Sequence, residues 1–224
     1  MTDAKPAAIR TPIRIWDAPI RLFHWILAAG IVFAWWAAET HHMDWHKDAG
    51  SAVAGLLVFR VWYGVFGSST AKFSDFVKGP KAVLAYLGGK SKATSPGHNP
   101  AGGWSVVLML LTTIAVVAFG LFAVDTDGIE SGPFSNLVDF DTGRLASKAH
   151  GLAFEGLEIL IGLHLLAIAF YTVIKRKALI PAMITGKRKP DGDEASLRPA
   201  GWISTLIALI LGLATAAVLI KLSQ

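Results

Sequence analysis

Five long apolar blocks constrain the fold of this 224-residue chain more than any other feature. A helix needs about 20 consecutive apolar residues to cross the hydrocarbon core of a bilayer. The blocks that reach or approach this length are 20–38, 49–66, 104–124, 152–174 and 202–219. Because lipid offers backbone groups no hydrogen bonds, each block must form a helix. The sequence therefore predicts an all-α protein, an integral membrane helical bundle with a four-helix core and a fifth C-terminal transmembrane helix.

The composition limits the chemistry that such a bundle can carry. The chain has no cysteine, which excludes disulfides, cysteine-ligated iron–sulfur clusters and haem attached through C-x-x-C-H. Any haem must therefore be held non-covalently. Arg10 and Arg14 precede the first apolar block, and Arg21 stands at its start. We interpret this block as an uncleaved signal anchor. The alternative, a cleaved signal peptide, would remove His24.

The net charge of +5 is distributed unevenly over the loops. Basic residues gather before the first block, between the second and third, and after the fourth. Segments 39–48 and 125–148 contain few Lys or Arg residues, and the second is rich in Asp and Glu. The positive-inside rule then places the N-terminus in the cytoplasm, and five spans place the C-terminus on the outer side of the membrane. The charges are thus topology signals, and no nucleic acid partner is expected.

Histidines are the candidate ligands. Ionisable side chains inside spans are costly and tend to mark function, and neutral imidazoles are common ligands of b-type haem. A low-spin haem needs two, one on each face. The chain has seven histidines, namely His24, His41, His42, His46, His98, His150 and His164. Of these, His41 and His42 lie in a polar turn and His98 in a loop, and we do not expect them to be ligands.

The spacing of His150 and His164 is the most informative. Fourteen residues make nearly four helical turns, so both rings project from one face about 21 Å apart. His24 lies near the cytoplasmic end of the first span. His46 lies at the outer mouth of the second, where we expect Asp44 to be the N-cap. The predicted pairs are His46 with His150 outside and His24 with His164 inside, unless these are ordinary hydrogen-bonded core residues.

Three further polar residues lie within the spans. Arg60 is a candidate to bind a haem propionate, or to reach the membrane surface with its long side chain. Glu155 and Glu158 are candidates to relay protons to a quinone, or to bond a neighbouring helix. Gly50 and Gly120 favour either close haem packing or ordinary helix contacts.

These residues stand in stretches that resemble bacterial cytochrome b561 and the b-type cytochrome of nickel–iron hydrogenases. The resemblance spans about residues 13–189 and is carried, in order, by WDAPIRLFHW at 16–25, HKDAG at 46–50, FR at 59–60, FSDFV at 73–77, GG at 88–89, GHNPAGGW at 97–104, the histidines at 150 and 164, and AMITGK at 182–187.

The resemblance implies a four-helix domain, 1–189, that binds two haem b through His24, His46, His150 and His164. Residues 190–224 then form a linker and an added helix. The chain departs from the family pattern around Gly64, which Trp62 and Tyr63 precede.

The resulting hypothesis is a dihaem b-type cytochrome that transfers electrons between the quinone pool and a periplasmic or membrane-bound redox partner. That partner would be a cytochrome c or the catalytic subunit of an oxidoreductase. The alternatives are a stand-alone superoxide:quinone oxidoreductase and a haem-free transition-metal carrier. Whether the chain is itself an enzyme stays open between them.

Overall fold

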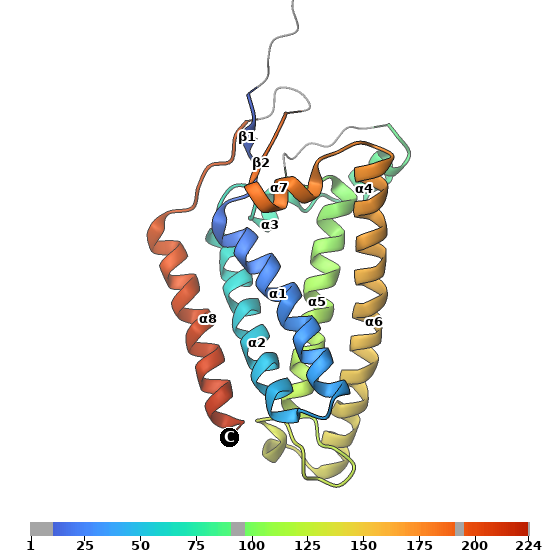
Figure 1. Ribbon diagram of the computed structural model, residues 1–224, viewed down its shortest axis with the longest axis vertical. Coiled ribbons are helices and arrows are strands. Elements are labelled where there is room, and N and C mark those ends of the chain that lie inside the picture. Colours follow the sequence, from blue (N-terminus) through green and yellow to red (C-terminus); the bar gives the residue numbers. More distant parts are fainter. Residues whose placement is uncertain (1–10, 91–96, 191–194, 224) are drawn as a thin grey trace, which may run out of the picture.

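Five long helices dominate the structure, a computed structural model that describes residues 11–90, 97–190 and 195–223 (Figure 1). All five are long and apolar enough to cross a membrane. They are α1 (Ala18–Glu39), α2 (Met43–Phe66), α5 (Pro100–Phe122), α6 (Phe140–Val173) and α8 (Trp202–Leu222). The predicted all-α membrane bundle is therefore confirmed.

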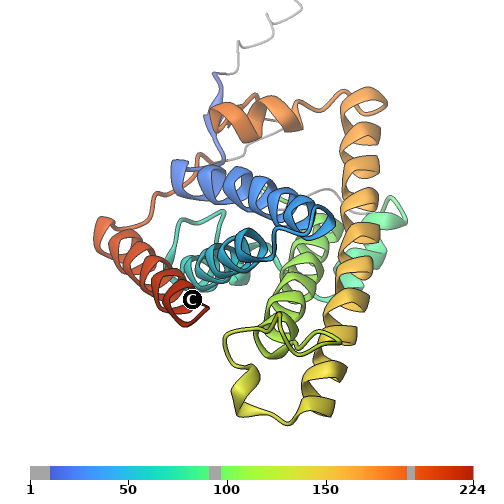
Figure 2. The same cartoon turned by 60° about the horizontal axis from the view of Figure 1, so that its bottom comes forward.

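The helices pack in a chain of neighbours rather than all against one another. α1 packs against α2, α2 also touches α5, and α6 packs against α5. α8 lies against α2, on the side of the bundle away from α6 (Figure 2). The helices α1 and α2 therefore face α6 across the middle of the bundle with little backbone contact between them.

Short elements cover one end of the bundle. The strands β1 (Ile13–Arg14) and β2 (Lys187–Arg188) form a two-stranded antiparallel sheet with α7 (Leu179–Thr185) beside it. The helices α3 (Phe73–Phe76) and α4 (Pro80–Leu87) lie at the same end of the bundle, α4 against α5 (Figure 1). This is the basic end of the molecule. The opposite, acidic end holds the turn between α1 and α2 and the connection from α5 to α6, which includes the 3-10 turn η1 (Ser135–Leu137).

Helix α6 begins twelve residues before the predicted apolar block that starts at 152. Asp139 is its N-cap, and its carboxylate accepts hydrogen bonds from Thr142 N at 2.9 Å and Thr142 Oγ1 at 2.7 Å. Asp141 adds a negative charge in the first turn, which the helix dipole favours. Hydropathy finds only the lipid-embedded part of a helix, whereas capping sets its true start.

The start of α2 also differs from the prediction. His42, not Asp44, occupies the N-cap, and its side chain makes no capping bond. Asp44 lies in the first turn instead, where its carboxylate is 3.2 Å from Lys47 Nζ. Helix α2 thus starts two residues earlier than an N-cap at Asp44 would place it.

The buried residue Asp17 ties α1 to α2 at the basic end. Its Oδ1 accepts from Ile20 N at 3.3 Å and so caps α1. Its Oδ2 accepts from the Tyr63 hydroxyl at 2.5 Å, and Tyr63 is only 1% exposed. One turn further on, the Arg21 guanidinium donates to the carbonyl of Ile184 in α7. These contacts explain why the 16–25 stretch is polar at the start of a membrane helix.

Helix α8 packs closely on α2 at a pair of glycines. A Cβ added to Gly212 would lie 2.8 Å from the Gly55 carbonyl oxygen, and Ala208 next to it is fully buried. The Trp62 indole donates to Ser204 O at 3.2 Å. Small residues allow the backbones of membrane helices to approach each other in this way. The added fifth helix is thus an integrated part of the bundle.

We therefore expect Gly212→Leu to separate α8 from α2. Overpacking of this kind costs about 1–3 kcal/mol, so the melting temperature of the detergent-solubilised protein should fall. Ala214→Leu adds the same side chain on the exposed face of α8 and should leave the melting temperature unchanged. Equal melting temperatures for the two variants would contradict the glycine contact.

Candidate functional site

Two histidines from different helices meet near the acidic end. His46 stands in the first turn of α2 and His150 in α6, and their ring centroids are 5.8 Å apart with the planes nearly perpendicular. Their helices do not pack against each other, so the side chains bridge the gap. We call His46 and His150 the acidic-end pair.

Both rings of the acidic-end pair are fixed by backbone carbonyls. His46 Nδ1 lies 2.9 Å from Ala34 O of α1, and His150 Nδ1 lies 2.8 Å from Val116 O of α5. A carbonyl oxygen only accepts, so Nδ1 must carry the proton in each ring. The lone pair is then on Nε2, which is the state a metal ligand requires, and the hydrogen bond from Nδ1 to the carbonyl sets the ring orientation.

Glycines allow close approach to this pair. A Cβ on Gly120 of α5 would lie only 2.9 Å from His150 Nδ1. Gly50 follows His46 by one turn, and a Cβ there would meet no heavy atom within 4 Å. Gly120 lets the His150 ring lie against α5. Gly50 leaves the surface of α2 beside His46 without a side chain.

The separation of the acidic-end pair is close to the one that two imidazoles would need to hold one haem iron between them. Two metal–nitrogen bonds of about 2 Å, plus about 1.2 Å from each nitrogen to its ring centre, would put the centroids about 6.4 Å apart. The observed separation is 5.8 Å. The donor set, two neutral imidazoles on opposite sides, is the one that low-spin b-type haem uses.

The second predicted pair lies toward the basic end. His24 is in α1 and His164 in α6, and the two side chains are close enough to interact electrostatically. Helix α6 is unbroken from His150 to His164, so the predicted rise of about 21 Å along it applies. Among the described residues, His24 Nδ1 is buried and has no hydrogen-bond partner. Within the described part of the chain, His24 therefore lacks the carbonyl contact that both rings have at the acidic end.

Arg60 is buried near the basic end. It is 4% exposed, and its guanidinium carbon lies 4.6 Å above the centre of the Phe73 ring. Its Nη1 has no hydrogen-bond partner among the described residues. A side chain so enclosed does not extend to the membrane surface. It offers an unpaired positive donor inside the bundle.

His98 is the residue that sequence reasoning set aside. It lies between the rings of Trp16 and Phe76, with centroids at 4.8 and 4.6 Å. Burial, and then the nearby Arg60 and His164, lower the pKa of His98 to about 3, so the ring is neutral at physiological pH. The signal in the sequence that pointed to a buried His98 was its place in the GHNPAGGW stretch. Asn99 of that stretch caps α5, so His98 lies directly before a membrane helix.

The remaining ionisable candidates lie outside both pairs. Glu155 and Glu158 are exposed on α6. His41 stands in the turn after α1 with a left-handed φ of 59°, and His42 stacks on Trp45 with centroids 4.7 Å apart. Within the described residues no cluster of three or more His, Asp or Glu side chains is found.

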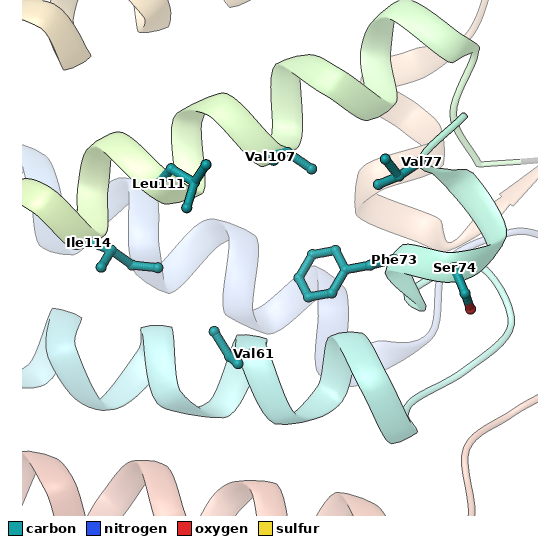
Figure 3. A pocket seen from close by; sticks show the side chains of 7 residues that line it. All are labelled: Val61, Phe73, Ser74, Val77, Val107, Leu111 and Ile114. Atoms are coloured by element: carbon teal, nitrogen blue, oxygen red, sulfur yellow. The ribbon is translucent and has the colours of Figure 1, made fainter. Parts of the chain in front are cut away.

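An apolar cavity of about 520 Å³ opens between α2, α3 and α5 (Figure 3). Phe73 projects into it, and Ser74 is its single polar side chain. The other lining residues are aliphatic, namely Val61, Val77, Val107, Leu111 and Ile114. Because Arg60 lies over the Phe73 ring, one aromatic side chain stands between this cavity and the buried cation.

A membrane bundle that brings histidines of two different helices together, each with Nε2 free of the proton, has the architecture of a membrane-embedded b-type cytochrome. Comparison with known families agrees. Residues 15–186 match the family model described as prokaryotic cytochrome b561, and the chain belongs to this family. It is thus a multi-pass membrane cytochrome of the kind that binds haem b and transfers electrons. No curated protein and no solved structure matched the chain.

We expect Gly120→Val to disturb the acidic-end pair specifically. The added side chain would take the space of the His150 ring, so haem bound there should be lost while haem at the other pair stays. The haem-to-protein ratio and the reduced-minus-oxidised spectrum measure this. Gly156→Ala, where a Cβ meets nothing within 4 Å, is the matched control and should keep the wild-type ratio.

Proposed function

We propose that the chain holds two haem b, one between His46 and His150 and one between His24 and His164. It would carry electrons across the bilayer between membrane quinone and a redox partner. The observation that carries this proposal is the acidic-end pair, with its 5.8 Å centroid separation and both Nδ1 atoms bound to carbonyls. The second pair follows because α6 presents His164 on the same face.

The haems would supply one-electron exchange at iron, and the protein would supply ligands, spacing and burial. One helix, α6, gives a ligand to each haem and so fixes their separation along the membrane normal. The carbonyls of Ala34 and Val116 hold the acidic-end rings in the ligating tautomer. Arg60 adds a buried positive charge near the other haem.

The proposed orientation follows the charges. The basic end carries the Lys and Arg residues of β1, β2, α4, the residues that flank α3 and the segment after α6, and the positive-inside rule places it in the cytoplasm of a bacterium. The acidic end is then periplasmic. His46 and His150 would form the outer site and His24 and His164 the inner one.

Charge also favours one class of partner at the acidic end. Asp127, Asp139 and Asp141 are exposed there. Lys47, by contrast, is paired with Glu130 at 3.1 Å and with Asp44. A negative surface attracts a basic protein such as a c-type cytochrome and repels an anion such as superoxide. We therefore favour the electron-transfer partner over the superoxide reaction.

The apolar cavity supports a quinone as the membrane-side reactant. Its aliphatic lining suits a quinone ring and tail, and Phe73 brings it next to Arg60 at the basic end. A quinone bound there would exchange electrons with the basic-end haem.

Alanine variants of the four histidines test the pairing. His46→Ala and His150→Ala should each remove the same haem, and His24→Ala and His164→Ala the other, so that each single variant keeps one haem per chain. Haem assay and redox titration identify which component is lost. His41→Asn, in the exposed turn, should keep two. Loss of different haems in His46→Ala and His150→Ala would contradict the pairing.

A larger side chain in the cavity tests the quinone site. We expect Leu111→Trp to slow haem reduction by a quinol analogue severalfold, because the indole would fill the space, while haem content stays at the wild-type value. Stopped-flow spectroscopy measures the rate. Leu108→Trp adds the same bulk on α5 outside the cavity lining and should keep the wild-type rate. Equal rates in all three proteins would remove the cavity from the proposal.

A further inference from the structure

The two ends of the bundle differ in whether their buried polar atoms have hydrogen-bond partners. At the acidic end both histidine Nδ1 atoms are bonded to carbonyls. Toward the basic end, His24 Nδ1, Arg60 Nη1 and His98 Nδ1 are all buried with no partner among the described residues. A buried donor without an acceptor is costly, so such a group needs a partner, and a bound ligand, ion or water can supply it.

Aromatic rings connect Arg60 to His98. The guanidinium lies 4.6 Å above the Phe73 ring, Phe73 contacts Phe76 at 5.8 Å, and Phe76 contacts His98 at 4.6 Å. Trp16 touches His98 at 4.8 Å, almost perpendicular to it. The rings hold both polar side chains in place without using any of their hydrogen-bonding capacity.

The chemistry of the two groups defines what they would bind. Arg60 is a permanent cation with several donors, and a neutral imidazole has one N–H to give. The carboxylate of Asp17 is already bound to Tyr63 and to the first turn of α1. The complementary ligand is therefore an anionic oxygen group from outside the chain, and a carboxylate suits a guanidinium best.

We propose that His98 and Arg60 together hold a propionate carboxylate of the haem at the basic-end pair, with His98 donating from Nδ1 and Arg60 from Nη1. The proposal rests on the proposed function, because it requires a haem between His24 and His164. His98 is then a positioning residue at the edge of the haem. It does not ligate the iron.

The bond has a consequence for the redox potential. The negative charge of a propionate stabilises ferric iron. When hydrogen-bond donors neutralise that charge, ferric iron is stabilised less and the haem is reduced more easily. Removing the His98 donor should therefore lower the midpoint potential of the basic-end haem. It should leave the other haem unchanged, since that lies about 21 Å away along α6.

The experiment compares His98→Leu, His98→Gln and the control His41→Asn in the full chain. Haem content, the low-spin EPR signals and both midpoint potentials are measured, and the basic-end haem is the component that survives in His46→Ala. We expect His98→Leu to keep two low-spin haems. Its basic-end haem should be about tenfold harder to reduce, which is a shift of about 59 mV for one electron. His98→Gln keeps an N–H donor and should recover most of the shift.

Three outcomes would overturn the inference. Unchanged potentials in His98→Leu would show that His98 does not touch the propionate. A high-spin or missing basic-end haem in both His98→Leu and His98→Gln would make His98 an axial ligand instead. An equal shift in His41→Asn would make the effect non-specific. Fewer than two haems in the wild-type chain would overturn the proposed function itself, which is a separate result.

Discussion

A single unbroken helix sets the geometry of this molecule. Helix α6 carries one histidine of each pair on one face, and it packs against α5 while facing α1 and α2. Because the rise per residue of a helix is fixed, the chain length between His150 and His164 determines how far apart the two proposed haem sites lie. The other helices need only bring His24 and His46 to the matching depths. Asp17 at the start of α1 contributes by fixing how that helix enters the bundle.

The sequence predicted the class of fold well, because membrane helices leave a strong signal in hydropathy. All five predicted spans exist, including the last. The bounds were less accurate where polar residues extend a helix beyond the lipid, as Asp139 and Thr142 do for α6. The close contact of Gly55 with Gly212 could not be predicted, since glycines occur in membrane helices for several reasons.

The candidate site was predicted in part. Periodicity and depth suggested which histidines face each other, and the structure brings His46 and His150 together as that argument required. The spacing and depth arguments did not place His98 inside the bundle, because a residue in a Gly- and Pro-rich segment is normally read as exposed. Its environment comes from Trp16 and Phe76, which are 82 and 22 positions away in the chain. Only tertiary packing could reveal that contact.

The carbonyls that orient the acidic-end pair have a consequence for how this protein can vary. Both acceptors belong to the main chain, at Ala34 and Val116, so no side chain at either position is needed for the bond. Substitution there should be tolerated as long as the helix persists. Variation among relatives at positions 34 and 116 would therefore not mean that these positions are unimportant. Substitutions to proline or to bulky residues would be the informative exceptions.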